Sequence, residues 1–375
     1  MTMTTTIELK PTGEPLAAEQ RAEILADPGF GRYFTDHMVT ARYTEGRGWH
    51  DAQLRPYGPI EIDPATAALH YGQEIFEGLK AYRQENGDVA AFRPEANSAR
   101  LNRSARRMGM PEIPRDLFIG SIDALVRQDV AWVPDDPEKS LYLRPFVFAT
   151  ETGLGVNRPA GEYLFILIAS PAGSYFSGVG KPVTAWLSTE YVRAAPGGTG
   201  EAKCGGNYAA SFLAQAEAVA HGCDQVCWLD AVEHRYVEEM GSNNLFFVYG
   251  SGEDARLFTP ELSGSLLPGI TRDSLLKAAA DLGIPAEEGR ISVEQLRADA
   301  ASGAITEAFG SGTAAVVTPI GGFKAAEYAI VIGDGQPGPT TARVRAHLLA
   351  VQHGESDDKH GWLHTSIPAR ESLAR

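Results

Sequence analysis

Apolar and polar residues along the chain alternate in short segments that predict a mixed α and β protein. Phe118, Ile122 and Leu125 lie at helical spacing within residues 115–130, so this segment predicts a helix with one buried side. Short apolar runs at 140–150 and 163–170 are instead typical of buried strands. Residues 39–92 are expected to form strands broken by turns. Further strands are predicted at 183–187, 226–230, 236–239 and 245–249, and further helices at 96–108, 207–221, 271–282 and 293–302.

The clearest break in this pattern is the segment 171–182, which is rich in Gly, Pro and Ser and is typical of a domain boundary. The pattern therefore predicts two lobes. Residues 1–28 are expected to form an N-terminal arm, residues 29–172 an N-terminal α/β domain, residues 173–183 an interdomain loop, and residues 184–375 a C-terminal domain.

Composition narrows the classes of function. Lys and Arg number 33 against 48 Asp and Glu, a net charge of −15, which argues against a nucleic-acid partner because a binding face must neutralise phosphates. The longest strongly apolar run, residues 163–169, is too short to span a bilayer, and the N-terminal residues lack a secretory signal. Three cysteines without a close CxxC pair indicate reduced thiols, so we expect a cytoplasmic protein with no metal site.

Glycine is unusually frequent, with 40 among 375 residues, and five glycines flank Lys203 between Gly197 and Gly206. Most lysines in such loops are simply solvated. Small neighbours would also let a planar ligand reach the ε-amine, and a desolvated lysine can attack an aldehyde as a nucleophile. The local pattern leaves both interpretations open.

Two adjacent carboxylates, Glu238 and Glu239, end a predicted strand, where successive side chains face opposite ways. One of them is expected to point inward and meet a cationic group, although an exposed acidic strand end fits the pattern equally well. The Gly-containing turns at 267–276 and 309–318 each suit a phosphate, because helix starts and tight turns expose N–H groups. Ordinary helix capping explains such turns as well.

In the N-terminal half, Tyr142 and Arg144 lie two apart on a predicted strand and so share one face. A guanidinium beside a phenol suits a carboxylate substrate, and a cross-strand salt bridge is the alternative. Four arginines on the predicted helix 96–108 are typical of a solvated helix face. They are Arg100, Arg103, Arg106 and Arg107.

Six segments occur in one order along the chain: HYGQEIFEGLKAYR, LYLRP, RAAPGGTGEAKCGGNYAAS, EEMGSNN, LPGITRDSLL and FGSGTAAVV. Together they resemble the branched-chain amino-acid aminotransferases, which are pyridoxal-phosphate enzymes of fold type IV, over residues 29–364. The resemblance implies a two-domain fold with a small N-terminal α/β lobe and a larger C-terminal lobe that has a β-barrel-like core. It also implies a homodimer.

The resemblance further implies the cofactor roles. Lys203 corresponds to the catalytic lysine that forms the internal Schiff base and moves a proton between the substrate Cα and the cofactor C4′. Glu239 corresponds to the carboxylate that keeps the pyridine nitrogen protonated, and Tyr208 to the phenol on the 3-oxygen. The remaining positions implied for cofactor binding are Arg100, Arg193, Ser242, Asn243, Leu267, Gly269, Ile270, Thr271, Gly312 and Thr313.

For substrate, the resemblance implies reversible, ping-pong amino transfer between leucine, isoleucine or valine and 2-oxoglutarate, with Arg144 serving the 2-oxoglutarate half-reaction. The positions implied for substrate binding are Tyr71, Phe76, Tyr142, Arg144, Tyr175, Thr313 and Ala314. Two positions depart from the family pattern: Asn243 stands where an apolar residue is common, and Ser242 replaces a frequent threonine.

Three other functions compete with this prediction. A D-amino-acid aminotransferase or an aminodeoxychorismate lyase would reuse Lys203 and Glu239, but both usually lack the first two segments. A Schiff-base aldolase without cofactor would use Lys203 alone and leave the phosphate turns without a purpose. A non-catalytic binding protein would leave Tyr142, Arg144 and Lys203 without a shared explanation.

Overall fold

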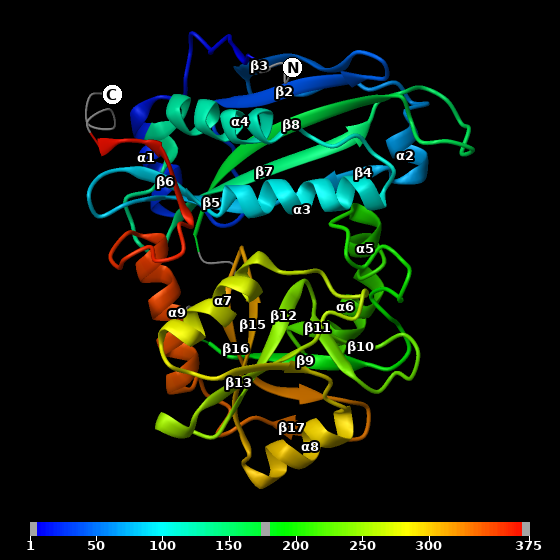
Figure 1. The fold of residues 1–375 in the computed structure, drawn as a ribbon, viewed down its shortest axis with the longest axis vertical. Coiled ribbons are helices and arrows are strands. Elements are labelled where there is room, and N and C mark those ends of the chain that lie inside the picture. Colours follow the sequence, from blue (N-terminus) through cyan, green and yellow to red (C-terminus); the bar gives the residue numbers. More distant parts are fainter. Residues whose placement is uncertain (1–5, 174–180, 370–375) are drawn as a thin grey trace. The chain divides into compact units, whose positions relative to one another are not determined.

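The computed structural model describes residues 6–173 and 181–369, which form two compact units (Figure 1). The first unit comprises residues 1–175, 202–205 and 350–375, and the second comprises residues 176–201 and 206–349. No helix in the described part of the chain is long and apolar enough to cross a membrane.

The first unit is built on one twisted sheet, whose strand order is β1-β3-β2-β8-β7-β5-β6-β18, with β4 paired to β7. Every neighbouring pair is antiparallel except β1 with β3. The central strand β8 is buried along most of its length, as its apolar run predicts. The strands are β1 (Glu8–Leu9), β2 (His37–Thr44), β3 (Gly48–Pro56), β4 (Glu74–Phe76), β5 (Leu79–Arg83), β6 (Val89–Phe92), β7 (Ser140–Ala149), β8 (Glu162–Ala172) and β18 (Leu363–Ile367).

Helices α3 (Pro94–Arg107) and α4 (Arg115–Gln128) pack against each other, and α4 also contacts the sheet. Pro94 begins α3, where its missing N–H costs nothing. The buried side of α4 carries Phe118, Ile122 and Leu125, as the spacing predicts, and these residues belong to the main core of the first unit. The shorter helices of this unit are α1 (Ala18–Ala26), α2 (Ala67–Tyr71) and the 3₁₀ turn η1 (Val130–Trp132).

The second unit is built on a closed barrel of six strands, in which β11, β10, β9, β16, β15 and β12 pair in sequence and β12 returns to β11. This barrel confirms the barrel-like core that the resemblance implies. Strands β13 and β14 extend the sheet from β12, and β17 pairs with β16. The strands are β9 (Val183–Ser188), β10 (Gln225–Leu229), β11 (Val237–Met240), β12 (Asn243–Tyr249), β13 (Arg256–Pro260), β14 (Ala286–Gly289), β15 (Ile305–Gly312), β16 (Val316–Lys324) and β17 (Ala329–Val331).

Helices surround this barrel: α6 packs on β9 and β10, while α7 and α8 pack on β15. The single helix predicted at 207–221 is two helices, because the chain turns after α5, where Ser211 N–H and Oγ both bond Tyr208 O. The helix at 339–352 was not predicted. The helices are α5 (Gly205–Ala209), α6 (Phe212–Ala220), α7 (Ile270–Asp281), α8 (Val293–Ser302), α9 (Pro339–Gln352) and the 3₁₀ turn η2 (Gly252–Asp254).

The two units differ from the predicted domains in two places. Residues 350–375 belong to the first unit because β18 pairs antiparallel with β6, a pairing that joins chain positions far apart. Residues 202–205 also belong to the first unit, although the flanking residues belong to the second. Most of the predicted interdomain loop at 173–183, including Tyr175, lies outside the described residues.

Candidate active site

The backbone around Lys203 is fixed within the first unit by three hydrogen bonds. Lys203 N–H donates to Ser104 Oγ of α3 at 2.9 Å, and Lys203 O accepts from Phe76 N–H at 2.9 Å. Two residues later, Gly205 N–H donates to a carboxylate oxygen of Glu74 at 2.5 Å. These contacts place the lysine at a defined position between α3 and β4, so it is not a solvated lysine on a loose loop.

The Lys203 amine lies 4.8 Å from the centre of the Phe76 ring. Burial of the amine, together with the nearby Arg100 charge, lowers the pKa of Lys203 to about 8, although Glu77 acts in the opposite direction. A substantial fraction of these amines is therefore uncharged near neutral pH. An uncharged amine is the form that reacts with an aldehyde.

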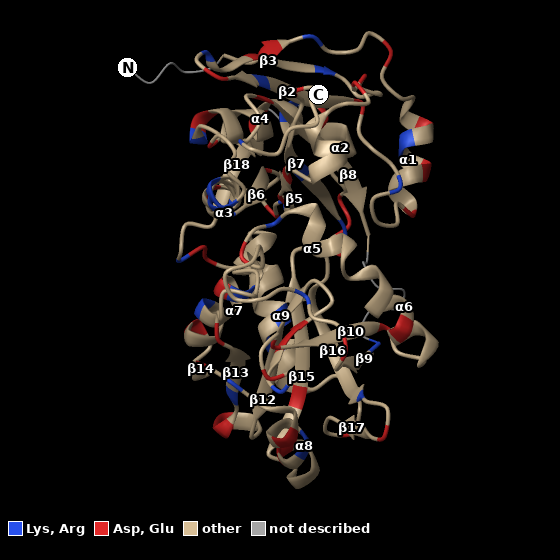
Figure 2. Ribbon diagram, turned by 90° about the vertical axis from the view of Figure 1, so that its right-hand side faces the viewer, with Lys and Arg blue, Asp and Glu red and all other residues tan. Residues whose placement is uncertain are grey.

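Arg100 lies on the buried side of α3 and forms two parallel hydrogen bonds with Glu77. Arg100 Nε donates to Oε1 at 2.7 Å and Nη2 to Oε2 at 2.8 Å, and both side chains are almost fully buried. The prediction of a solvated arginine face is thus wrong for Arg100, while Arg103, Arg106 and Arg107 are exposed, as predicted. Basic residues colour much of α3 in Figure 2.

Tyr142 and Arg144 share one face of β7, as their spacing predicts. Arg144 Nη2 donates to the Tyr142 phenol oxygen at 3.0 Å, and the guanidinium lies over the rings of Phe76 and Tyr142 at 4.9 and 5.3 Å. Within the described residues, Arg144 Nε is buried without a hydrogen-bond partner. The salt-bridge alternative is therefore not what the structure shows.

Gly78 makes room for this phenol. A Cβ atom at Gly78 would lie 1.9 Å from the Tyr142 oxygen, so any larger residue would displace the ring. Phe30 packs edge-on against the same ring, with 5.0 Å between ring centres. The cluster formed by Lys203, Phe76, Tyr142 and Arg144, with the pair Arg100–Glu77, is called the lysine cluster below.

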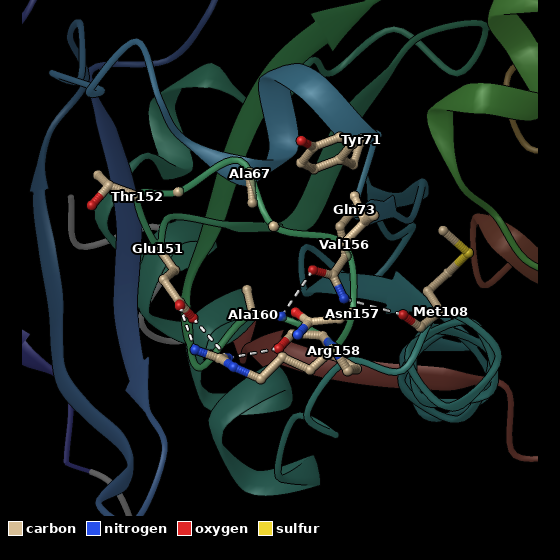
Figure 3. Close-up of a pocket in the computed structure, with 13 residues that line it drawn as sticks. Ala67, Tyr71, Gln73, Met108, Glu151, Thr152, Val156, Asn157, Arg158 and Ala160 are labelled. Carbon is tan, nitrogen blue, oxygen red and sulfur yellow. Dashed lines mark hydrogen bonds and ion pairs between the residues drawn. The ribbon is translucent and has the colours of Figure 1, made fainter.

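Tyr71 lies apart from the lysine cluster in the described chain, at the end of α2 (Figure 3). Its hydroxyl donates to Leu154 O at 2.6 Å, and it lines a pocket of about 490 Å³ together with residues 151–160. This pocket contains neither Lys203 nor Tyr142. Leu154 and Val156 beside it are exposed apolar residues.

In the second unit, Glu239 of β11 is 1% exposed and its carboxylate has three hydrogen-bond donors. Arg193 Nε lies 3.0 Å from Oε2, while Oε1 accepts from Leu267 N–H at 2.6 Å and from Asn244 Nδ2 at 3.1 Å. Arg193 and Asn244 also bond the Ser265 and Leu267 carbonyls. Glu239 is thus held as a carboxylate with capacity for one further donor at Oε2.

The expectation that only one of the paired glutamates is buried is wrong, because Glu238 is also buried. The two side chains do have different partners, as the alternation along a strand requires. Glu238 Oε1 accepts from the hydroxyls of Ser263 at 2.8 Å and Ser265 at 2.5 Å.

The predicted phosphate turns lie close to Glu239 in the second unit. Glu239 pairs with Asn244, and Asn244 pairs with Ser311, so these residues form a row across three strands that ends beside Gly312. The Asn244 amide also reaches Leu267, two residues before Gly269. The helix α7 begins at Ile270 with Gly269 as its N-cap and no side-chain cap, so Thr271 is its second residue.

The other predicted positions of this unit lie around the same end of the barrel. Ser242 is exposed in the turn between β11 and β12, and Tyr208 is half-buried in α5. Asn243 is buried against Gly312. Thr313 and Ala314 are half-buried in the turn between β15 and β16.

Sequence reasoning missed several residues that support these positions. Glu74 and Glu77 stand in the segment HYGQEIFEGLKAYR, but nothing in the local pattern shows that one binds Gly205 and the other Arg100. Burial raises the pKa of Glu74, against the lowering effect of the Gly205 hydrogen bond. Ser104 and Asn244 were also missed, since their partners lie elsewhere in the chain.

A closed six-stranded barrel and a sheet-based unit that carries a near-neutral lysine define an enzyme of the fold-type IV pyridoxal-phosphate class. The family described as "Amino-transferase class IV" matches residues 74–322. The chain belongs to the class IV aminotransferases, which confirms the family predicted from the six segments.

Similar proteins agree with this assignment. A "Probable branched-chain-amino-acid aminotransferase" of Streptomyces coelicolor is 61% identical over 96% of this chain and 99% of its own length. A branched-chain-amino-acid aminotransferase of Mycobacterium tuberculosis is 59% identical over 93% of this chain and 95% of its own. The crystal structure of the Escherichia coli branched-chain amino acid aminotransferase is 32% identical, with a TM-score of 0.72, over 88% of this chain and 99% of that one.

Proposed function

We propose that the protein is a pyridoxal-phosphate-dependent branched-chain-amino-acid aminotransferase that exchanges amino groups between leucine, isoleucine or valine and 2-oxoglutarate. The carrying observation is the lysine cluster, in which a lysine with a pKa of about 8 lies against an aromatic ring and beside an arginine with an unpartnered Nε. The relatives with 59–61% identity bear this name, and a similar Thermus structure contains pyridoxamine 5′-phosphate.

The residues present fit the cofactor. The uncharged amine of Lys203 suits an aldehyde, and the Glu239 carboxylate keeps one acceptor position for a protonated ring nitrogen. The start of α7 and the turn after β15 offer backbone N–H groups to a phosphate. We assign cofactor binding to these groups together with Arg100, Arg193, Tyr208, Ser242, Asn243, Leu267, Gly269, Ile270, Thr271, Gly312 and Thr313.

When bound, pyridoxal phosphate withdraws electrons from the substrate Cα. Lys203 accepts the proton from Cα and returns it to the cofactor C4′, a task that suits a base with a pKa near the working pH. Glu239 holds the ring nitrogen protonated. Arg193, Asn244 and the Leu267 N–H hold Glu239 in place.

Substrate recognition rests on one apolar and one cationic feature. The Phe76 ring offers an apolar wall to a branched side chain, and such walls separate leucine, isoleucine and valine only weakly. Arg144 and Tyr142 bind the second carboxylate of glutamate or 2-oxoglutarate, for which Arg144 Nε offers a donor. We also assign Tyr71, Tyr175, Thr313 and Ala314 to substrate binding.

We further propose that the enzyme acts as a cytoplasmic homodimer. Its cysteines at 204, 223 and 227 are buried and free, as expected of a reducing compartment. The exposed Leu154 and Val156 beside Tyr71 form an apolar surface of the kind that a second subunit covers.

The decisive experiment adds pyridoxal phosphate to the purified protein and follows its colour, then assays leucine with 2-oxoglutarate. We expect a coloured protein that forms glutamate, and Lys203→Ala is expected to lower turnover by about a thousandfold or more because it removes the base and the attachment point. Lys277→Ala, which removes an exposed lysine, is the matched control. A colourless wild type, or a Lys203→Ala variant with normal turnover, would contradict the proposal.

A further inference from the structure

The carboxylate of Glu238 has no role in the site described so far, yet it is 5% exposed. A buried carboxylate normally has a cationic partner. In the described part of the chain Glu238 forms no ion pair, and its Oε1 instead accepts two hydroxyl hydrogen bonds, from Ser263 and Ser265. Its neighbour Glu239 has Arg193 as a cationic partner.

The segment 263–267 connects the two glutamates. Ser263 and Ser265 bind Glu238 through their side chains, and Leu267 binds Glu239 through its backbone N–H at 2.6 Å. Ser263 Oγ and Ser265 Oγ also lie 2.6 Å apart, so the two hydroxyls and the carboxylate form one network. Glu238 therefore fixes the same segment that supplies a donor to Glu239.

A second connection runs through Arg193. Its guanidinium donates Nη1–H to the carbonyl of Ser265 and to Gly200 O, while Nε lies 3.0 Å from Glu239 Oε2. The position of the Ser265 carbonyl thus decides how Arg193 meets Glu239. The backbone of Ser265 also packs directly on Gly200, where a Cβ atom would lie 2.3 Å from the Ser265 oxygen.

We propose that Glu238 is a positioning residue for the cofactor-binding carboxylate: through Ser265 it orients the Leu267 N–H and the Arg193 guanidinium, and so holds Glu239 in line with the ring nitrogen of the cofactor. This inference rests on the proposed role of Glu239. It assigns Glu238 the task of a hydrogen-bond acceptor, which an uncharged amide also performs.

The cavity next to Glu238 supplies a matched control. Glu238 lines a cavity of about 400 Å³ within the second unit, together with Ser263, Leu266 and Glu261. Glu261 is exposed and has no hydrogen bond to Ser263 or Ser265. Glu261→Leu thus removes an acidic side chain from the same cavity and leaves the serine network intact.

The test compares Glu238→Leu, Glu238→Gln and Glu261→Leu in three measurements on the full chain. They are the dissociation constant for pyridoxal phosphate, the pH midpoint of the absorbance of the bound cofactor, and thermal unfolding of the protein without cofactor. We expect Glu238→Leu to weaken cofactor binding about tenfold and to shift the pH midpoint, because Glu239 loses its fixed orientation. Glu238→Gln and Glu261→Leu should stay within about twofold of the wild type.

Ser265→Ala tests the same network if Glu238→Leu fails to fold. It is expected to reproduce the loss of affinity and the shifted midpoint, and combining it with Glu238→Leu should add little further loss because both break one network. A Glu238→Leu or Ser265→Ala protein that unfolds at a lower temperature but keeps the affinity and the midpoint would overturn the inference. A wild type that binds no pyridoxal phosphate would instead overturn the proposed function.

Discussion

The lysine cluster of the first unit and the surroundings of Glu239 in the second unit fix their functional groups in different ways. In the first unit, side chains hold one another, as in the Arg100–Glu77 pair and the Arg144–Tyr142 contact. In the second unit, Glu239 is held largely through main-chain groups, namely Leu267 N–H and the carbonyls that orient Arg193 and Asn244.

This difference indicates where each region tolerates change. Removing one partner from a buried ion pair leaves a charge in a low-dielectric environment, so the lysine cluster is sensitive to side-chain truncation. A site held by main-chain groups is sensitive instead to added volume, because a backbone cannot move aside like a flexible side chain. The following predictions test this contrast, beginning with the largest expected effect.

The Arg100–Glu77 pair is the most sensitive point of the lysine cluster. Glu77→Ala removes the carboxylate that binds both Arg100 Nε and Nη2, and we expect the free energy of unfolding to fall by about 3–5 kcal/mol. Urea denaturation of the protein without cofactor measures this change.

Glu112→Ala is the control for this prediction. Glu112 pairs with Arg106 at 2.8 Å on the exposed side of α3, and exposed pairs contribute at most about 1 kcal/mol. Equal losses in the two variants would show that the first unit does not depend on its buried pair.

The second prediction concerns Gly200, whose Cα packs against the Ser265 backbone. Gly200→Ala places a Cβ atom 2.3 Å from the Ser265 oxygen, so the backbone must shift, at a cost of about 1–3 kcal/mol. Because Ser265 O orients Arg193, affinity for pyridoxal phosphate should fall as well. Both effects are measured by denaturation and by titration with the cofactor.

Gly206→Ala provides the comparison within the same glycine-rich segment. A Cβ atom at Gly206 would meet no atom within 4 Å, and alanine suits the helix α5 better than glycine does. We expect this variant to be as stable as the wild type. If Gly200→Ala behaves in the same way, the second unit is not limited by added volume.

The sequence predicts those parts of the structure that depend on local pattern. The helix with Phe118 and Ile122, the buried strand at 163–170, and the glycines around Lys203 follow from spacing and composition. The family motifs add the barrel, which no local pattern reveals.

The remainder depends on contacts between distant segments. Arg100 is separated from Arg103 only by the face of α3 on which it lies, and its partner Glu77 is 23 residues away. The pairing of β18 with β6 joins residues 363–367 to residues 89–92, so the end of the chain could not be placed in the first unit from sequence. Both glutamates at 238 and 239 are buried because Ser263, Ser265 and Arg193 satisfy them.

The smallest predicted effect is a pH dependence that belongs to the lysine cluster alone. Burial lowers the pKa of Lys203 to about 8, so the uncharged amine increases about tenfold per pH unit below pH 8 and levels off above it. We expect the rate at which pyridoxal phosphate attaches to the protein to follow this profile. A rate that keeps rising to pH 10 would indicate an ordinary lysine.

Stability gives an independent measurement of the same group. Between pH 8 and 10.5 the unfolded chain binds more protons at Lys203 than the folded chain does, so the contribution of Lys203 to the free energy of unfolding rises with pH across this window. Below pH 8 both states are protonated and the burial of the charge destabilises the fold by a constant amount. Lys203→Met should therefore be more stable than the wild type below pH 8, and its advantage should shrink as the pH rises. Lys277→Met removes an exposed lysine and should show no such window, and a constant difference between Lys203→Met and the wild type across this range would mean that the amine is not buried.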